Sequence, residues 1–290
     1  MNNKINVGLM LGGNYEANFK LCAELGLDSF IMNAAYTPER RDHFIANAKE
    51  IKAMEEHYGV KISALWAGWN EPAVWSFYEG QDTLGLVPLA FRDRRIALID
   101  NATKVAHALE IEDVITHAGY LPENPQDPLY TSFVSMMRYY CEYNFKPRGV
   151  YFDFETGQET PVTVRRAIED IGTGNLGINL DTANLICYGK ANPVDAVKVF
   201  GQYVRCTHMK DALWPTDGKT LGEEVRIGTG EVNFPEVIRL LNACGYKGHF
   251  TIEREIAQGE EFNRDVKESA EMLRREGAKY DWDFKDENNA

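Results

Sequence analysis

Short apolar runs alternate with longer amphipathic stretches along the whole chain. The first run, from Ile5 to Met10, precedes a stretch from Tyr15 to Leu25 in which apolar residues recur at helical spacing. The same alternation continues to the C-terminus and predicts eight strands connected by helices. The expected strands are residues 5–10, 29–32, 60–66, 113–117, 150–155, 177–181, 204–208 and 249–253.

Helix starts and loops support this order of elements. A helix is expected from Pro38 to Gly59, since proline favours a first turn and glycine favours the end of a helix. The connection from Ala67 to Leu89 is rich in Gly, Pro and Trp and is longer than usual, so we expect it to cover a site. Capping side chains followed by a first-turn proline stand at Thr160, Asn192 and Asn233.

The chain length leaves one or two domains open, because 290 residues suit either two ordinary domains or one large α/β barrel. No linker or change of composition divides the chain, and no Gly-x-Gly-x-x-Gly follows the first strand. These features favour a single (β/α)8 barrel over an open doubly wound sheet. We therefore expect one barrel over residues 1–279 and a surface tail over residues 280–290.

Charge and hydropathy exclude several classes of protein. The 31 Lys and Arg residues face 44 Asp and Glu residues, which gives a net charge of −13 and disfavours nucleic acid as a partner. No apolar run reaches the roughly 18 residues that a membrane span needs. The first residues lack the apolar stretch and cleavage site of a signal peptide, so a cytoplasmic location is expected.

The last four expected strands all end in a residue that can bind a metal. Active sites of such barrels lie at the C-terminal ends of the strands, where these side chains can converge. A lone carboxylate or imidazole there is more often a solvated loop residue or a helix cap. Four in succession favour one shared site, and the oxygen-rich set suits Mn²⁺, Mg²⁺ or Co²⁺, with Zn²⁺ also compatible. The four residues are Glu155, Asp181, His208 and Glu253.

Motifs around these residues resemble the sugar phosphate isomerase/epimerase superfamily, whose members have a xylose isomerase-like barrel. The resemblance is strong from Val150 to Glu255 and architectural before that. It implies a metal-dependent isomerase or epimerase of a sugar or sugar phosphate. The segments that carry it are Phe-Glu155-Thr-Gly-Gln-Glu-Thr, Asn-Leu-Asp181-Thr-Ala-Asn184-Leu, Thr-His208-Met-Lys210-Asp211-Ala, Arg226-Ile-Gly-Thr-Gly and Gly-His-Phe-Thr-Ile-Glu253-Arg-Glu255.

Ketose 3-epimerases of this superfamily hold a divalent ion, usually Mn²⁺, with four such residues. Carried over, the resemblance implies Glu155, Asp181, His208 and Glu253 as ligands, with the first and last also moving protons. The ion would stabilise the enediolate that forms when a proton leaves the carbon next to a carbonyl. Two bases on opposite faces would give epimerisation, and one shuttling base would give isomerisation.

Five nearby residues are expected to contact substrate, and four of them have an ordinary alternative. Arg226 could hold a hydroxyl or phosphate, or form a surface ion pair. Lys210 could form a supporting ion pair, and Trp66 could pack in the core instead of walling the pocket. His117 could contact substrate, act as a separate base, or make a structural hydrogen bond. Asn184 stands where ketose epimerases often have histidine, so the substrate of those enzymes should not be assigned to this chain.

Other functions remain open at this stage. Metal-dependent lyases of the superfamily, such as C-glycoside deglycosidases with a small partner subunit and inosose dehydratases, share the proton-abstraction step. A barrel that only binds a sugar would need no metal. An endonuclease IV-like enzyme is disfavoured by the missing histidines and by the negative charge. We expect a carbohydrate substrate and a homo-oligomer, and the sequence does not decide whether the sugar carries a phosphate.

Overall fold

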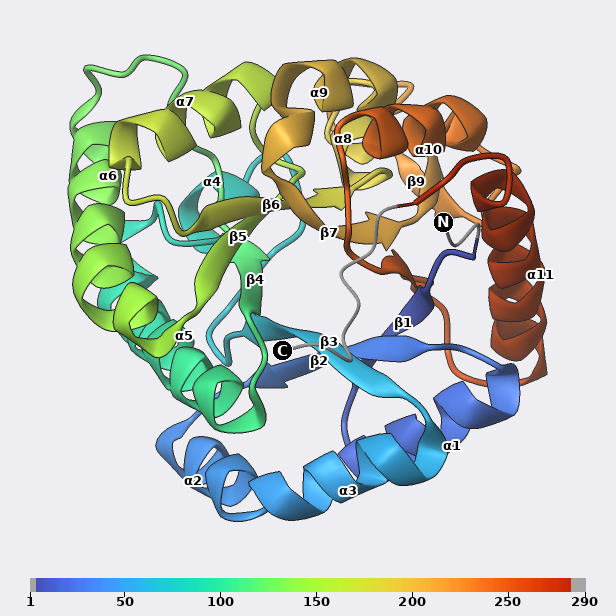
Figure 1. Ribbon diagram of the computed structural model, residues 1–290. Helices are drawn as coiled ribbons and strands as arrows, with labels where there is room; N and C mark the ends of the chain where they lie inside the picture. The colour runs from blue at the N-terminus through green and yellow to red at the C-terminus, as the bar shows by residue number, and fades with distance from the viewer. Residues whose placement is uncertain (1–3, 283–290) are drawn as a thin grey trace.

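Eight parallel strands form a closed barrel in the computed structural model, which describes residues 4–282 (Figure 1). Each strand pairs with its neighbours around the ring, in the order β1-β10-β7-β6-β5-β4-β3-β2. The predicted (β/α)8 barrel is therefore confirmed. The strands are β1 (Val7–Gly12), β2 (Ser29–Ala35), β3 (Lys61–Gly68), β4 (Asp113–His117), β5 (Tyr151–Glu155), β6 (Leu176–Asp181), β7 (Val204–Met209) and β10 (Phe250–Ile252).

Helices surround the barrel as an outer layer (Figure 1). The expected caps at Thr160, Asn192 and Asn233 each accept a backbone N–H bond at a helix start. The helices are α1 (Tyr15–Leu25), α2 (Pro38–Ala46), α3 (Ala48–Tyr58), α4 (Gly80–Thr83), α5 (Leu89–Leu109), α6 (Pro128–Tyr140), α7 (Pro161–Ile171), α8 (Asn184–Cys187), α9 (Pro193–Phe200), α10 (Phe234–Ala243) and α11 (Glu260–Gly277).

The structure corrects the predicted helix from Pro38 to Gly59, which is two helices that meet at Asn47. The Asn47 side-chain amide donates to the His43 carbonyl oxygen at 2.7 Å. A side chain that bonds the backbone in this way competes with the helical hydrogen bonds, so the first helix ends there. The apolar periodicity continues across this break, which is why the sequence indicated a single helix.

A short antiparallel hairpin follows β7 and lies outside the barrel sheet. Its strands are β8 (Asp211–Leu213) and β9 (Glu223–Val225). The sequence predicted no strand between residues 208 and 249. Three-residue strands leave too little periodicity to recognise, and their pairing depends on contacts across the loop.

The barrel interior is apolar in its middle and polar at the C-terminal strand ends. A small cluster of Ile31, Ala64, Ile115 and Cys206 fills the centre, with Met10 and Trp66 packed against it. The larger core lies between the strands and the surrounding helices and includes Phe152, Phe154 and Leu180. Because side chains alternate along each strand, the inward set places charged groups directly above the interior cluster.

The C-terminal segment differs in part from the predicted surface tail. Tyr280 packs against the core, and Trp282 is buried, with its ring 5.4 Å from that of Phe250. Burial of these aromatic rings ties residues 280–282 to the barrel. The rest of the predicted tail, residues 283–290, lies outside the described residues. Within residues 4–282, none of the helices has both the length and the apolar character that a membrane span requires.

Candidate metal centre

Glu155, Asp181, His208 and Glu253 converge at the C-terminal end of the barrel. Each offers one ligand atom, and these four atoms lie within 4.8 Å of one another. Parallel pairing places Asp181 beside His208 on adjacent strands, while Glu155 ends β5 and Glu253 follows β10. These are the four residues predicted from the sequence, and the strand order brings them together.

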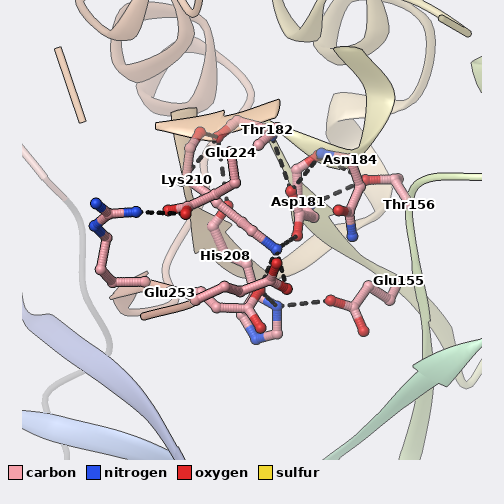
Figure 2. Close-up of polar contacts among 12 residues, drawn as sticks. Glu155, Thr156, Asp181, Thr182, Asn184, His208, Lys210, Glu224 and Glu253 are labelled. Carbon is pink, nitrogen blue, oxygen red and sulfur yellow. Dashed lines mark hydrogen bonds and ion pairs between the residues drawn. The ribbon is translucent and has the colours of Figure 1, made fainter. Parts of the chain in front are cut away.

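His208 lies between two carboxylates at the centre of the group (Figure 2). Its Nδ1 atom is 2.7 Å from Glu155 Oε1 and 3.3 Å from Glu253 Oε2. Asp181 Oδ1 accepts the backbone N–H groups of Ala183 and Asn184 at 2.9 and 2.8 Å. These contacts fix the orientation of the imidazole and of one carboxylate.

A buried ligand atom of this group fits a metal ion. Within residues 4–282, Asp181 Oδ2 has no hydrogen-bond partner. A buried polar atom without a partner is costly, and a bound cation would remove that cost. Three carboxylates and one imidazole also form the hard donor set of Mn²⁺ or Mg²⁺. The residues present therefore fit a divalent ion.

The carboxylates of this group favour the presence of positive charge beside them. Burial raises the pKa of Asp181 to about 8, and the neighbouring Glu253 and Glu155 carboxylates add to that rise. Burial opposes protonation of His208, but the carboxylates of Glu155 and Glu253 outweigh it and raise the pKa of the imidazole to about 10. The buried carboxylates thus favour protonation of Asp181 and His208, as expected of a site that binds a cation.

Lys210 is the cationic side chain nearest to these ligands and is 2% exposed. Its Nζ atom is 2.7 Å from Glu255 Oε1, 3.3 Å from Glu253 Oε2 and 3.7 Å from Asp181 Oδ2. Figure 2 shows the ammonium group directed toward Asp181 and Glu253. Lys210 lines the cavity, and the supporting ion pair considered from the sequence is also present.

Aromatic side chains form part of the cavity wall. Trp66 Nε1 donates to Glu155 Oε2, and His117 Nε2 lies 3.2 Å from the same oxygen. Trp75, from the long loop after β3, places its ring 5.0 Å from that of His117. Trp66, Trp75 and His117 all line a cavity of about 370 Å³, within the roughly 300–1,000 Å³ of small-molecule sites. The loop that was predicted to cover the site thus contributes Trp75 to the cavity wall.

Two buried arginines of α5 anchor the covering loop. Arg95 is 0% exposed and donates to the carbonyl oxygens of Gly85 and Pro72 at 2.6 and 3.1 Å. Its guanidinium also lies over the Trp69 ring at 4.5 Å. Arg92 donates to the carbonyl of Leu86. The loop is thus tied to the helix behind it and forms a fixed wall.

The remaining predicted contacts divide into two groups. Asn184 lines the cavity, as expected. Arg226 does not line it, and its guanidinium pairs with Glu268 of α11, which is the surface ion pair considered as the alternative. Glu224 and Tyr188 line the cavity without having been singled out from the sequence. Glu224 comes from β9, which no sequence signal indicated.

Asp211, whose role the sequence left unclear, organises the loop beside the site. Its Oδ2 atom accepts the N–H groups of Gly228 and Gly230, each at 2.9 Å, and its Oδ1 atom accepts that of Val232 at 3.0 Å. The carboxylate is completely buried. It therefore holds the glycine-rich turn that follows β9.

The Asp211→Asn variant is expected to lower the free energy of unfolding by about 2–4 kcal/mol, because an amide replaces a buried charge-assisted acceptor. Urea unfolding followed by circular dichroism measures this. The control is Asp217→Asn, since Asp217 accepts the N–H groups of Lys219 and Thr220 in an exposed loop. We expect that change to cost under about 1 kcal/mol. Equal losses in the two variants would contradict the role given to Asp211.

Glu159 carries a further buried carboxyl close to the site. It is 2% exposed, and neither carboxylate oxygen has a hydrogen-bond partner in the described part of the chain. Burial raises its pKa to about 8. The folded state therefore keeps the proton that the unfolded state loses near pH 4.5. Stability contributed by this neutral group falls as the pH rises from about 4.5 to about 8.

The Glu159→Gln variant is expected to match the wild type near pH 5 and to be more stable at pH 9 by on the order of 2 kcal/mol. The amide keeps the shape of the side chain and cannot ionise. Thermal unfolding measured across this pH range tests the difference. Glu56→Gln, on the exposed face of α3, controls for loss of one negative charge. A gain that does not depend on pH would rule out this explanation.

A model of the xylose isomerase-like TIM barrel family matches residues 19–276 of the chain. An uncharacterized protein of Methanocaldococcus jannaschii is 27% identical over 201 residues. That alignment covers 63% of this chain and 62% of the relative, so it spans less than two thirds of either protein.

Two solved structures show the same architecture. A xylose isomerase domain protein from Planctomyces limnophilus is 29% identical, with a TM-score of 0.87 over 95% of this chain and 98% of the other. The 3-keto-D-glucoside 4-epimerase of E. coli is 15% identical, with a TM-score of 0.67 over 94% of this chain and 100% of the other. At that lower identity the likeness concerns the fold alone.

Proposed function

We propose that this chain, which belongs to the xylose isomerase-like TIM barrel family, is a metal-dependent sugar isomerase or epimerase. The observation that carries the proposal is the convergence of four ligand atoms within 4.8 Å, two of whose residues, Glu155 and Glu253, line a cavity with aromatic residues in its wall. Glu155, Asp181, His208 and Glu253 would hold the ion. We propose Mn²⁺ first, and the oxygen-rich donor set also suits Mg²⁺, Co²⁺ or Zn²⁺.

A bound divalent ion would supply positive charge that polarises a substrate carbonyl and offsets the charge left when the adjacent carbon loses a proton. Glu155 and Glu253 each place a carboxylate oxygen near His208 Nδ1 (Figure 2), and both residues line the cavity. One of them can remove a proton and the other can return one, which gives epimerisation. A single carboxylate that does both between neighbouring carbons gives isomerisation.

The residues that contact Glu155 and Glu253 favour proton transfer by these two carboxylates. Trp66 and His117 hold one oxygen of Glu155, and Lys210 holds Glu253 at 3.3 Å. Burial opposes ionisation of Glu155, but His117 and His208 outweigh it and lower its pKa. Glu155 is therefore ionised near neutral pH, and an ionised carboxylate can accept a proton.

A second candidate is a metal-dependent lyase that shares the proton-abstraction step. One observation favours it: His117 lines the cavity, and its Nδ1 atom has no hydrogen-bond partner within residues 4–282. An imidazole with a free nitrogen could act as a base separate from the metal ligands. Loss of water or of an aglycone from the substrate, detected by mass spectrometry, would identify this reaction.

Metal binding and solvent deuterium exchange together test the proposal. Purified protein is freed of metal with a chelator and titrated with Mn²⁺ in a calorimeter, and a panel of aldoses and ketoses is then incubated with it in D₂O. We expect one ion per chain and metal-dependent deuterium incorporation next to the carbonyl of at least one sugar. No binding of Mn²⁺, Mg²⁺, Co²⁺ or Zn²⁺ would overturn the proposal and leave a barrel that binds sugars without chemistry.

A further inference from the structure

We propose that the substrate of this cavity is an uncharged polyhydroxy carbonyl compound that carries neither a phosphate nor a carboxylate. The inference rests on the proposed function, because it concerns the same cavity and narrows the class of substrate. It addresses the choice between free sugar and sugar phosphate that the sequence left open.

Negative charge dominates the cavity wall. Among its lining residues within 4–282, Lys210 is the only lysine and no arginine is present. The carboxylates are Glu155, Glu224, Glu253 and Glu255. A divalent ion would not reverse this balance, because its three carboxylate ligands already carry one more charge than the ion. An anionic group would therefore enter a field that repels it.

The single lining cation is already neutralised. Lys210 Nζ is within 3.7 Å of three carboxylates, and its shortest contact, at 2.7 Å, is with Glu255. Two further arginines already have acidic partners and do not line the cavity. Arg254 pairs with Glu224, which lines the cavity, and, at 3.1 Å, with Asp265, while Arg226 pairs with Glu268.

The backbone groups that could hold a phosphate are also occupied. Barrels of this class often bind phosphate with the loops after the seventh and eighth strands and with nearby helix N-termini. Here the glycine-rich turn after β9 gives the N–H groups of Gly228, Gly230 and Val232 to the buried Asp211 carboxylate. The N–H groups of Ala183 and Asn184 point to Asp181 in the same way. Carboxylates of the protein thus already accept the hydrogen bonds of these N–H groups.

The rest of the wall suits a neutral sugar. Trp66, Trp75 and Tyr188 present aromatic faces, which pack against the C–H faces of sugars. Asn33 and Asn184 offer amides that can both donate to and accept from hydroxyl groups. Hydroxyls can donate to Glu224 and Glu255, whereas a phosphate dianion cannot. The lining therefore favours a ligand with many donors and no negative charge.

Matched ligand pairs test this inference by binding as well as by turnover. Mn²⁺-loaded protein is titrated in a calorimeter with D-fructose, D-tagatose and D-psicose and with their 6-phosphate esters. We expect at least one free ketose to bind with a Kd at least about tenfold below that of its ester. An ester that binds as tightly as its parent sugar, or the failure of every free ketose to bind, would overturn the inference.

Deuterium exchange in the same samples separates this inference from the proposed function. Exchange into a phosphate ester alone would retain the metal-dependent chemistry and overturn the neutral substrate. Tight binding of a free ketose without exchange or conversion would support the neutral ligand and contradict the isomerase. The two proposals can therefore fail independently.

The Glu255→Gln variant tests whether the ion pair with Glu255 prevents Lys210 from binding a phosphate. Removal of this charge leaves Lys210 less neutralised, so the Kd of the phosphate ester is expected to fall at least about threefold, with a smaller change for the free sugar. Glu223→Gln removes the same charge from an exposed neighbour in β9 that does not line the cavity. Equal effects of the two variants, or none, would show that Glu255 does not set the preference.

Discussion

The Glu253→Gln variant is expected to lose solvent exchange by about 10³-fold or more, because positioned acid–base groups contribute roughly 10²–10⁴-fold. The amide keeps the size of the side chain but cannot take a proton. Glu253 also contacts His208 and Lys210, and its pKa lies well below the usual range because these two cations outweigh the effect of burial. Deuterium incorporation by mass spectrometry, with saturating Mn²⁺, measures the loss.

Two measurements make this result specific to Glu253. Glu271→Gln, on the exposed face of α11, removes an equal charge far from the strand ends and should keep the full rate. Calorimetric titration with Mn²⁺ shows whether the variant still holds the ion. A variant that binds Mn²⁺ at saturation and exchanges at the wild-type rate would remove Glu253 from the chemistry.

The His208→Ala variant is expected to bind Mn²⁺ at least about 100-fold more weakly, since even outer partners of metal ligands contribute 10–100-fold. The change removes the single nitrogen ligand and leaves the Glu155 and Glu253 carboxylates without the group between them. Exchange into the sugar should then fall with metal occupancy. Calorimetry and elemental analysis of the dialysed protein measure both quantities.

Folding must be checked alongside this result, because His208 is completely buried. Circular dichroism and thermal unfolding establish that the barrel persists in the variant. His57→Ala, on the exposed face of α3, serves as the matched histidine control and should bind Mn²⁺ as the wild type does. Unchanged Mn²⁺ affinity in a folded His208→Ala protein would place the ion elsewhere.

The four metal-ligand candidates could be predicted from the sequence because each depends on local pattern. Alternation along a strand identifies the inward side chains, and a barrel brings the ends of its strands together. The capped helix starts at Thr160, Asn192 and Asn233 are local in the same sense, since cap and first turn are adjacent. The break at Asn47 could not be predicted in this way, because the apolar pattern continues across it and a single side-chain hydrogen bond ends the first helix.

By itself, then, the sequence determined the barrel, its order of elements and the polar strand ends, because these follow from periodicity and capping within single segments. Only the tertiary structure decided which charges reach the cavity. Arg226 pairs with Glu268, Lys210 pairs with Glu255, and Asp211 accepts hydrogen bonds from the glycine-rich turn. Each partner lies at least 17 residues away along the chain, so no local pattern encodes the pair. Folding selects these partners because a buried or crowded charge must find a counter-charge or hydrogen bonds in three dimensions.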